Sequence, residues 1–176
     1  MIKRTVAIFA AYDASEKAFC AMYLAEHISL KRYRHAIWIV PEDVPPKSRY
    51  HGFSHKWDAE ILSLKSESTE IKSRLNAKEG CELCLFFEES ERLRSLLPET
   101  SKTALLLDPA KWQGVSSKDF AKRCNYTLST SPAITRQLAR PNLLSNTLSF
   151  PYDHFVQMMP KVWLPSGETA TLLYAA

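Results

Sequence analysis

Short apolar runs alternate with segments of helical pattern along most of this chain, and this alternation limits the fold more than any other feature. The runs have the continuous apolar character of strands that are buried on both faces. We predict strands at residues 4–11, 35–40, 82–87, 103–107, 125–129 and 146–149, with a short extra strand at 61–64. Helices are predicted between them, from residue 13 onward and at 68–78, 89–97, 116–123 and 132–139.

Strands that alternate with helices pair in parallel, because each helix carries the chain back to the same edge of the sheet. The sequence therefore predicts an α/β fold: a Rossmann-like three-layer α/β/α sandwich with a mainly parallel sheet of five to seven strands. The length of 176 residues and the apolar content of 45% suit one such domain. We assign this domain to residues 1–160. Residues 161–176 end in the strand-like "ETATLLYAA" and are expected to be a crossover segment or the start of a missing second domain.

The charge distribution and the absence of an export signal indicate which partners and which cellular compartment to expect. The net charge of +4 is spread along the chain, and the densest basic group, "SLKRYRH" at 29–35, lies where a helix is predicted to end. Cations there complement the helix dipole, so we do not expect a nucleic-acid partner. No stretch approaches the ~20 apolar residues of a transmembrane segment. No export signal is recognised either, so we expect reduced thiols and a cytoplasmic protein.

The first strand leads into a turn that lacks glycine. In "VAIFAAYD", residues 6–13, the strand passes directly to Asp13, which is predicted to cap the first helix, with Glu16 completing a capping box. A strand–turn–helix unit that cradles a phosphate needs glycine where the backbone approaches the ligand. The sequence therefore predicts a strand–turn–helix unit that lacks a phosphate-binding turn.

Ligands of open parallel sheets bind beyond the carboxyl ends of the strands, so the candidate site residues come from the segments that follow the predicted strands. They are Tyr12, Asp13, Tyr50, His51, Phe53, His55, Glu88, Asp108, Ser129, Thr130 and Ser131. Several have a second explanation. Glu88 and Asp108 could serve acid–base chemistry or only cap the next turn, and capping is favoured for Glu88 with Glu89. The hydroxyls of Ser129 to Ser131 could cap a helix or help to receive an anion.

The segment "YHGFSHKW", residues 50–57, gathers two histidines and three aromatic residues. It could hold a sugar ring against its aromatic faces, or it could cover an edge of the core, and the sequence leaves both open. His51 and His55 lack a third ligand at a fixed spacing, so no metal site is expected.

Cys81 and Cys84 have the C-x-x-C spacing of a redox pair or of half a zinc site. They lie at the start of a predicted strand rather than of a helix, and no second pair follows to complete a zinc site. Residues three apart on a strand point to opposite faces, so we expect two separate, buried thiols.

The order of these elements resembles the N-terminal half of a two-domain glycosyltransferase of the GT-B type. The resemblance rests on "VAIFAAYD", on "ALLLD" ending in Asp108, on "TLSTSPAITRQL", on "NTLSFPYDHF", which is similar to a segment I-P-x-G-x-D, and on "ATLLYAA". The chain departs from the family in having no Gly-Gly after the first strand and in having Tyr152 at the crossover glycine.

The resemblance implies an acceptor-binding domain that is inactive without a donor-binding domain or subunit. It implies a sugar-containing acceptor, no cofactor in this half, Asp13 as the first candidate for a catalytic base, and acceptor contacts from the other candidate residues. A first turn without glycine is consistent with this half, because the other half of such an enzyme binds the nucleotide. The alternative is a non-catalytic Rossmann-like binding or assembly module, since a fold alone does not fix a function.

Overall fold

The computed structural model describes residues 4–11, 21, 35–44, 59–77, 79–107, 115–129 and 147–149. Its strands are β1 (Thr5–Phe9), β2 (His35–Val40), β3 (Ala59–Ser63), β4 (Cys81–Phe86), β5 (Lys102–Leu107), β6 (Tyr126–Ser129) and β7 (Thr147–Ser149). Its helices are α3 (Ser68–Leu75), α4 (Glu91–Leu96) and α5 (Val115–Lys122). The predicted helix from residue 13, the predicted helix at 132–139 and residues 161–176 lie outside the described residues, apart from Ala21, which is helical and buried.

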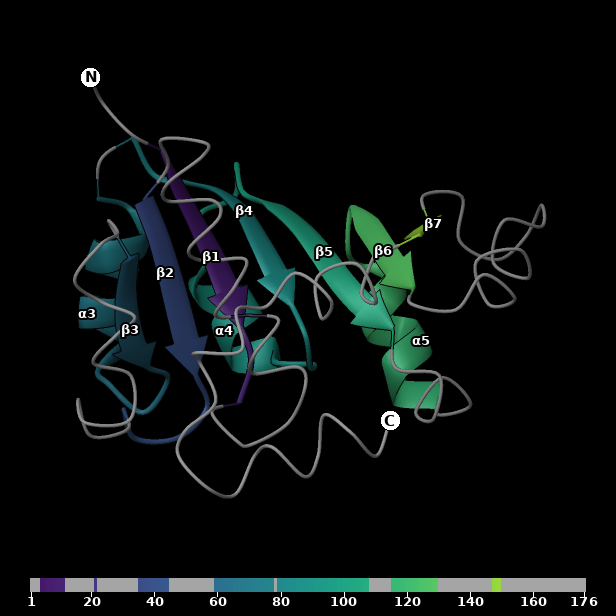
Figure 1. Cartoon of the computed structure of the whole chain (residues 1–176), viewed down its shortest axis with the longest axis horizontal. Helices are drawn as coiled ribbons and strands as arrows, with labels where there is room; N and C mark the ends of the chain where they lie inside the picture. The colour runs from purple at the N-terminus through teal and green to yellow at the C-terminus, as the bar shows by residue number, and fades with distance from the viewer. Residues whose placement is uncertain are drawn as a thin grey trace, which may run out of the picture.

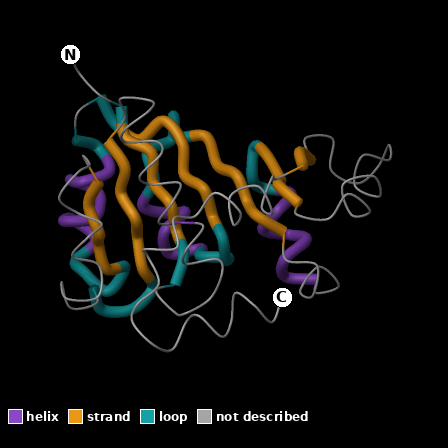
Figure 2. The backbone as a smooth tube through the Cα atoms, viewed as in Figure 1, coloured by secondary structure: helices purple, strands orange, loops and turns teal. Residues whose placement is uncertain are grey.

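The seven strands form one sheet in the order β3-β2-β1-β4-β5-β6-β7, and every neighbouring pair is parallel. Figure 1 shows the strands side by side with their arrowheads toward one edge, and Figure 2 shows the same twisted sheet as a continuous band of strands. This confirms the predicted Rossmann-like α/β fold with a parallel sheet. The division of the chain at residue 160 stays a prediction.

The core lies between one face of the sheet and the three described helices. Phe86 of β4 is fully buried and packs edge-on against Phe9 of β1 and Phe120 of α5, with ring centroids 6.1 and 5.2 Å apart. Helix α3 contributes Ile71 and Leu75 to the same cluster. The opposite face of the central strands is also buried: Val6, Ile8, Trp38, Val40, Leu85 and Leu106 are each at most 7% exposed. Burial of both faces explains why these strands read as continuous apolar runs.

The end of helix α3 differs from the sequence prediction for a local reason. Helix α3 ends at Leu75 rather than near residue 78, and Asn76 is its C-cap. The Asn76 side-chain amide donates to the Lys72 carbonyl oxygen, and the Ala77 N–H donates to the Arg74 carbonyl oxygen, three residues back instead of four. The turn into β4 then needs left-handed backbone, with φ of 103° at Glu79 and 84° at Gly80.

The predicted separation of Cys81 and Cys84 onto opposite faces is wrong. Thr5 pairs with Cys81, but Val6 pairs with Leu83, so Glu82 is an extra residue in β4. Such a bulge reverses the alternation of side chains. Both thiols therefore belong to the same hydrophobic cluster, and they are buried as expected, at 3% and 0% exposure.

None of the helices that the structure describes is both long and apolar enough to cross a membrane.

Candidate functional site

The strand order places a topological switch point between β1 and β4. From β1 the chain moves to β2 on one side, and from β4 it moves to β5 on the other side. In open α/β sheets, ligands bind outside the carboxyl ends of the two strands at such a point. Ala10 and Ala11 follow β1 there, and Phe87 to Ser90 follow β4.

The backbone of Ala10, the residue directly after β1, is hydrogen-bonded to β2 on both its N–H and its carbonyl group. The Ala10 N–H donates to the Ile39 carbonyl oxygen at 3.2 Å. The indole Nε1–H of Trp38 donates to the Ala10 carbonyl oxygen at 3.0 Å. Trp38 is fully buried, and a buried indole N–H needs such a partner. Because both backbone groups of Ala10 are engaged, this residue offers no free N–H to a phosphate, in agreement with the missing glycine.

Glu88 lies at the switch point, and one of its carboxylate oxygens is buried. The Phe87 N–H donates to the Phe9 carbonyl oxygen at 2.8 Å, which continues the pairing of β1 and β4 to the residue before Glu88. The Glu88 side chain is half-buried, and its Oε1 atom is buried without a hydrogen-bond partner among the residues that the structure describes. A buried carboxylate oxygen without a donor is costly, so a ligand donor at this position would relieve the cost.

The N-cap of α4 is Ser90, so the predicted N-cap role of Glu88 and Glu89 is wrong, while their predicted effect on the helix dipole stays a prediction. Ser90 has extended backbone angles, and its hydroxyl oxygen accepts a hydrogen bond from the Leu93 N–H at 3.1 Å. Ser, with Asp, Asn and Thr, is among the favoured N-cap residues. The Glu88 side chain is therefore not the N-cap acceptor of α4.

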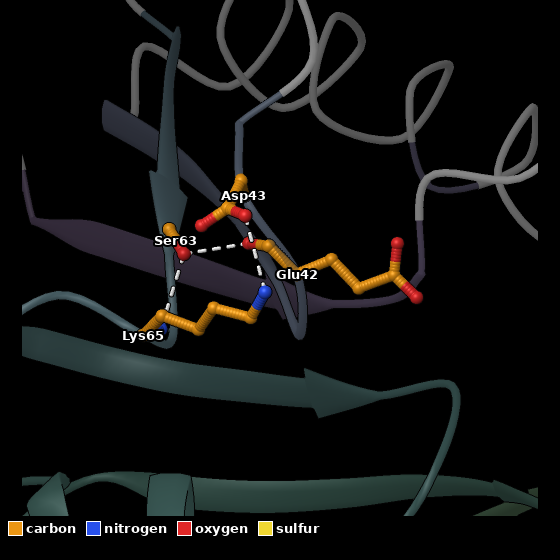
Figure 3. A network of polar contacts seen from close by, with 4 residues as sticks. All are labelled: Glu42, Asp43, Ser63 and Lys65. Atoms are coloured by element: carbon orange, nitrogen blue, oxygen red, sulfur yellow. Dashed lines mark hydrogen bonds and ion pairs between the residues drawn. The ribbon is translucent and has the colours of Figure 1, made fainter.

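A polar network that the sequence reasoning missed joins the ends of β2 and β3 at the same edge of the sheet (Figure 3). The Ser63 hydroxyl donates to the Glu42 carbonyl oxygen at 2.6 Å and accepts from the Lys65 N–H at 3.1 Å. Lys65 Nζ contacts Asp43 Oδ2 at 3.1 Å, while the Glu42 side chain points away from the other three residues. The acidic "PED" directly after a predicted strand was the available signal.

Of the other candidate residues, only Ser129 is described. It is the last residue of β6, it is fully buried, and it pairs with Leu107 of β5 and Ser149 of β7. Strand β6 is two strands from β4, or about 10 Å across the sheet. Tyr12, Asp13, Tyr50, His51, Phe53, His55, Asp108, Thr130 and Ser131 lie outside the described residues, and their roles stay predictions.

The three described cysteines are free thiols with unreactive surroundings. Burial raises the pKa of Cys84 well above its usual value, and burial also raises the pKa of Cys81 and of Cys124. A raised pKa disfavours the thiolate, which is the nucleophile and metal ligand. Within the described part of the chain, no group of three or more His, Cys, Asp or Glu could hold a metal ion.

The comparisons with known proteins yield a likeness of fold. No protein-family model matches the sequence, and no curated protein matches it. Among solved structures, the chain is similar to an alpha-glucosyltransferase in complex with UDP and a 13-mer DNA containing a central A:G mismatch. The TM-score is 0.48 and the identity 11%, over 85% of this chain and 40% of that one. The chain thus spans less than half of that enzyme's length, and the likeness is distant.

Proposed function

We propose that this chain is the acceptor-binding half of a glycosyltransferase of the GT-B type, which transfers a sugar from a nucleotide-sugar to a glycan or another sugar-containing acceptor. The acceptor binds at the carboxyl edge of the sheet, beside the switch point between β1 and β4. The nucleotide-sugar is held by a second domain or subunit, and this half transfers no sugar alone.

The observation that carries this proposal is the buried Oε1 atom of Glu88 at the switch point, which has no hydrogen-bond partner in the described part of the chain. A carboxylate there accepts hydrogen bonds from ligand hydroxyls, which a sugar supplies in number. The same division between the two halves is supported by the first turn, which has no glycine in its sequence, and by Ala10, whose N–H is already bonded to Ile39.

In this proposal Asp13 is the first candidate for the base that deprotonates the acceptor hydroxyl, because it follows the first strand. Its predicted capping role is separable by substitution. Asp13→Asn and Asp13→Ser both keep a cap and remove the carboxylate. In the complete enzyme, a large loss of turnover in both variants at an unchanged melting temperature supports the catalytic role. Full activity in both leaves Asp13 as a cap only.

The test of acceptor binding uses the purified 176-residue chain. A panel of neutral oligosaccharides is screened by saturation-transfer NMR, and Kd values of the hits are measured by calorimetry. Glu88→Gln is expected to weaken binding by about tenfold or more, because hydrogen bonds to a charged group contribute about 1.5–3 kcal/mol. Glu99→Gln is the matched control, since it makes the same change at an exposed residue in the loop between α4 and β5.

The same preparation is incubated with a panel of nucleotide sugars and monitored for nucleotide release. Sustained release, with no partner protein added, would contradict the proposed division between the two halves. The absence of binding to every oligosaccharide would favour a non-catalytic binding or assembly module.

A further inference from the structure

We infer that Trp38 is a positioning residue of the candidate site: its indole replaces a backbone hydrogen bond that Pro41 cannot make, and thereby fixes the point from which the first turn leaves β1. This inference rests on the proposed function, because the turn leads to Tyr12 and Asp13, a candidate acceptor contact and the candidate base. It concerns the hydrogen bond of the indole rather than the volume that the ring fills in the core.

The backbone hydrogen bonds between β1 and β2 keep one frame from the start of the strands to their end. At the start, the His35 N–H donates to the Arg4 carbonyl oxygen at 3.1 Å. At the end, the Ala10 N–H donates to the Ile39 carbonyl oxygen at 3.2 Å. In a parallel ladder of this frame, the next donor is the N–H of residue 41, and its acceptor is the Ala10 carbonyl oxygen.

The donor of this next hydrogen bond is missing, because residue 41 is proline and has no backbone N–H. The backbone of β2 therefore cannot satisfy the Ala10 carbonyl oxygen. The Trp38 side chain supplies the donor instead, and its Nε1–H lies 3.0 Å from that oxygen. Trp38 pairs with Ile8, two residues before Ala10, so the indole reaches along the strands toward their carboxyl ends.

This bond holds the end of β1 inside the core. Trp38 is fully buried and Ala10 is 1% exposed, and a buried carbonyl oxygen that loses its donor is costly. On the other side of β1, the Phe87 N–H donates to the Phe9 carbonyl oxygen at 2.8 Å. Of the hydrogen bonds that the structure describes on β1, the one from the indole is nearest to the first turn.

The first turn continues from the peptide unit that the indole holds. The Ala10 carbonyl group belongs to the peptide that joins Ala10 to Ala11, and a peptide unit is planar, so the indole sets the orientation of that plane. Tyr12 and Asp13 follow it in the sequence. Groups that contact a ligand must be held within about 0.5 Å of their productive positions. A change in the orientation of this peptide therefore reaches the ligand through these two residues.

The experiment uses a second-site rescue that separates the hydrogen bond from the packing of the ring. Trp38→Phe keeps an aromatic ring and removes the donor, and Pro41→Ala in the same chain returns a backbone N–H where the ladder requires one. Leu75→Ala is the control for lost stability, since it empties part of the core at a fully buried residue of α3. Each full chain is studied by triple-resonance NMR.

Trp38→Phe should move the carbonyl carbon resonance of Ala10 upfield, because a hydrogen bond deshields that carbon, and should shift the amide resonances of Tyr12 and Asp13. Adding Pro41→Ala should return all three toward their parent positions, whereas Leu75→Ala should leave them in place. If Trp38→Phe alone does not fold, the double variant is expected to fold again, and its failure to do so would overturn the inference.

Affinity for the tightest-binding oligosaccharide of the neutral panel is then measured by calorimetry. Trp38→Phe should bind it about tenfold more weakly, and the double variant should regain most of this loss. Unchanged affinity in Trp38→Phe, or an Ala10 resonance that Pro41→Ala does not restore, would overturn the inference and leave the proposed acceptor role standing. If no oligosaccharide of the panel binds, the proposed function fails, and the three resonances alone decide whether the indole positions the turn.

Discussion

Replacing Ser90 by alanine tests how the switch point is built, because it removes the cap of α4. In the structure the Ser90 hydroxyl is the acceptor of the Leu93 N–H at 3.1 Å. The helix that it caps buries Leu93 at 0% and Leu96 at 7% exposure, so loosening its first turn also loosens packing against the sheet. Loss of a serine N-cap costs about 1 kcal/mol. For a chain of this size that corresponds to a fall of about 2–4 °C in Tm.

Three further variants separate the cap from other effects. Ser90→Asp keeps an N-cap acceptor and should retain nearly all of the stability. Ser95→Ala removes an exposed hydroxyl that donates within the same helix, to the Arg92 carbonyl oxygen at 2.8 Å. Because alanine has the higher helix propensity, its effect should stay within about 0.5 kcal/mol of zero. Glu88→Ala should cost little stability, since it removes a partly buried carboxylate whose Oε1 has no described partner.

The free energy of unfolding of each variant is measured by urea denaturation followed by far-UV circular dichroism. The reasoning predicts that only Ser90→Ala loses about 1 kcal/mol. If Glu88→Ala loses that amount and Ser90→Ala behaves like Ser95→Ala, then Glu88 is the cap. The carboxylate would then have a structural task, and the main support for an acceptor site at the switch point would disappear.

Three other predictions concern the sheet and its turns. Trp38→Phe should lower the free energy of unfolding, measured in urea, by about 3 kcal/mol, because it leaves the Ala10 carbonyl oxygen without its donor and removes buried apolar surface. A loss below about 1 kcal/mol would contradict the role given to the indole. Burial raises the pKa of Cys84 well above its usual value of 9.0. The free energy of unfolding should therefore fall as the pH rises above 9.0, because the unfolded chain then releases a proton that the folded chain keeps. Cys84→Ala should reduce this dependence and leave the smaller part that Cys81 and Cys124 contribute, and a flat profile in the parent would refute it. Glu79→Gly should raise the free energy of unfolding by up to about 1 kcal/mol, because φ is 103° at Glu79 and glycine adopts this angle without strain. An unchanged or lower urea midpoint would show that the turn is not strained.

Much of the fold was predictable because the strands are buried on both faces. Strands β2 and β5 were predicted at their observed positions to within one residue at either end, since continuous apolar runs are a strong local signal. The helices were predicted less well at their ends, because caps depend on single polar contacts. Ser90 rather than Glu88 caps α4, and Asn76 ends α3 early.

The sequence predicted which segments could carry a ligand site, and that prediction stays untested. The rule that ligands bind at carboxyl strand ends selected Glu88 before any strand order was known. It did not select Glu42, Asp43 or Lys65, whose connection depends on Ser63 of a neighbouring strand. The bulge at Glu82, which brings Cys81 and Cys84 onto one face, left no mark in the pattern of apolar residues.

The sequence by itself determined that this chain forms a parallel α/β sheet and that its first turn has no glycine for a phosphate. Both properties are local: a run of apolar residues fixes strand character, and the absence of a residue type can be read directly. Only the tertiary structure decided the strand order, the switch point between β1 and β4, and the occupation of the Ala10 backbone by an indole 28 residues away. These properties depend on hydrogen bonds and packing between residues distant in the chain, which form only when the strands are brought together.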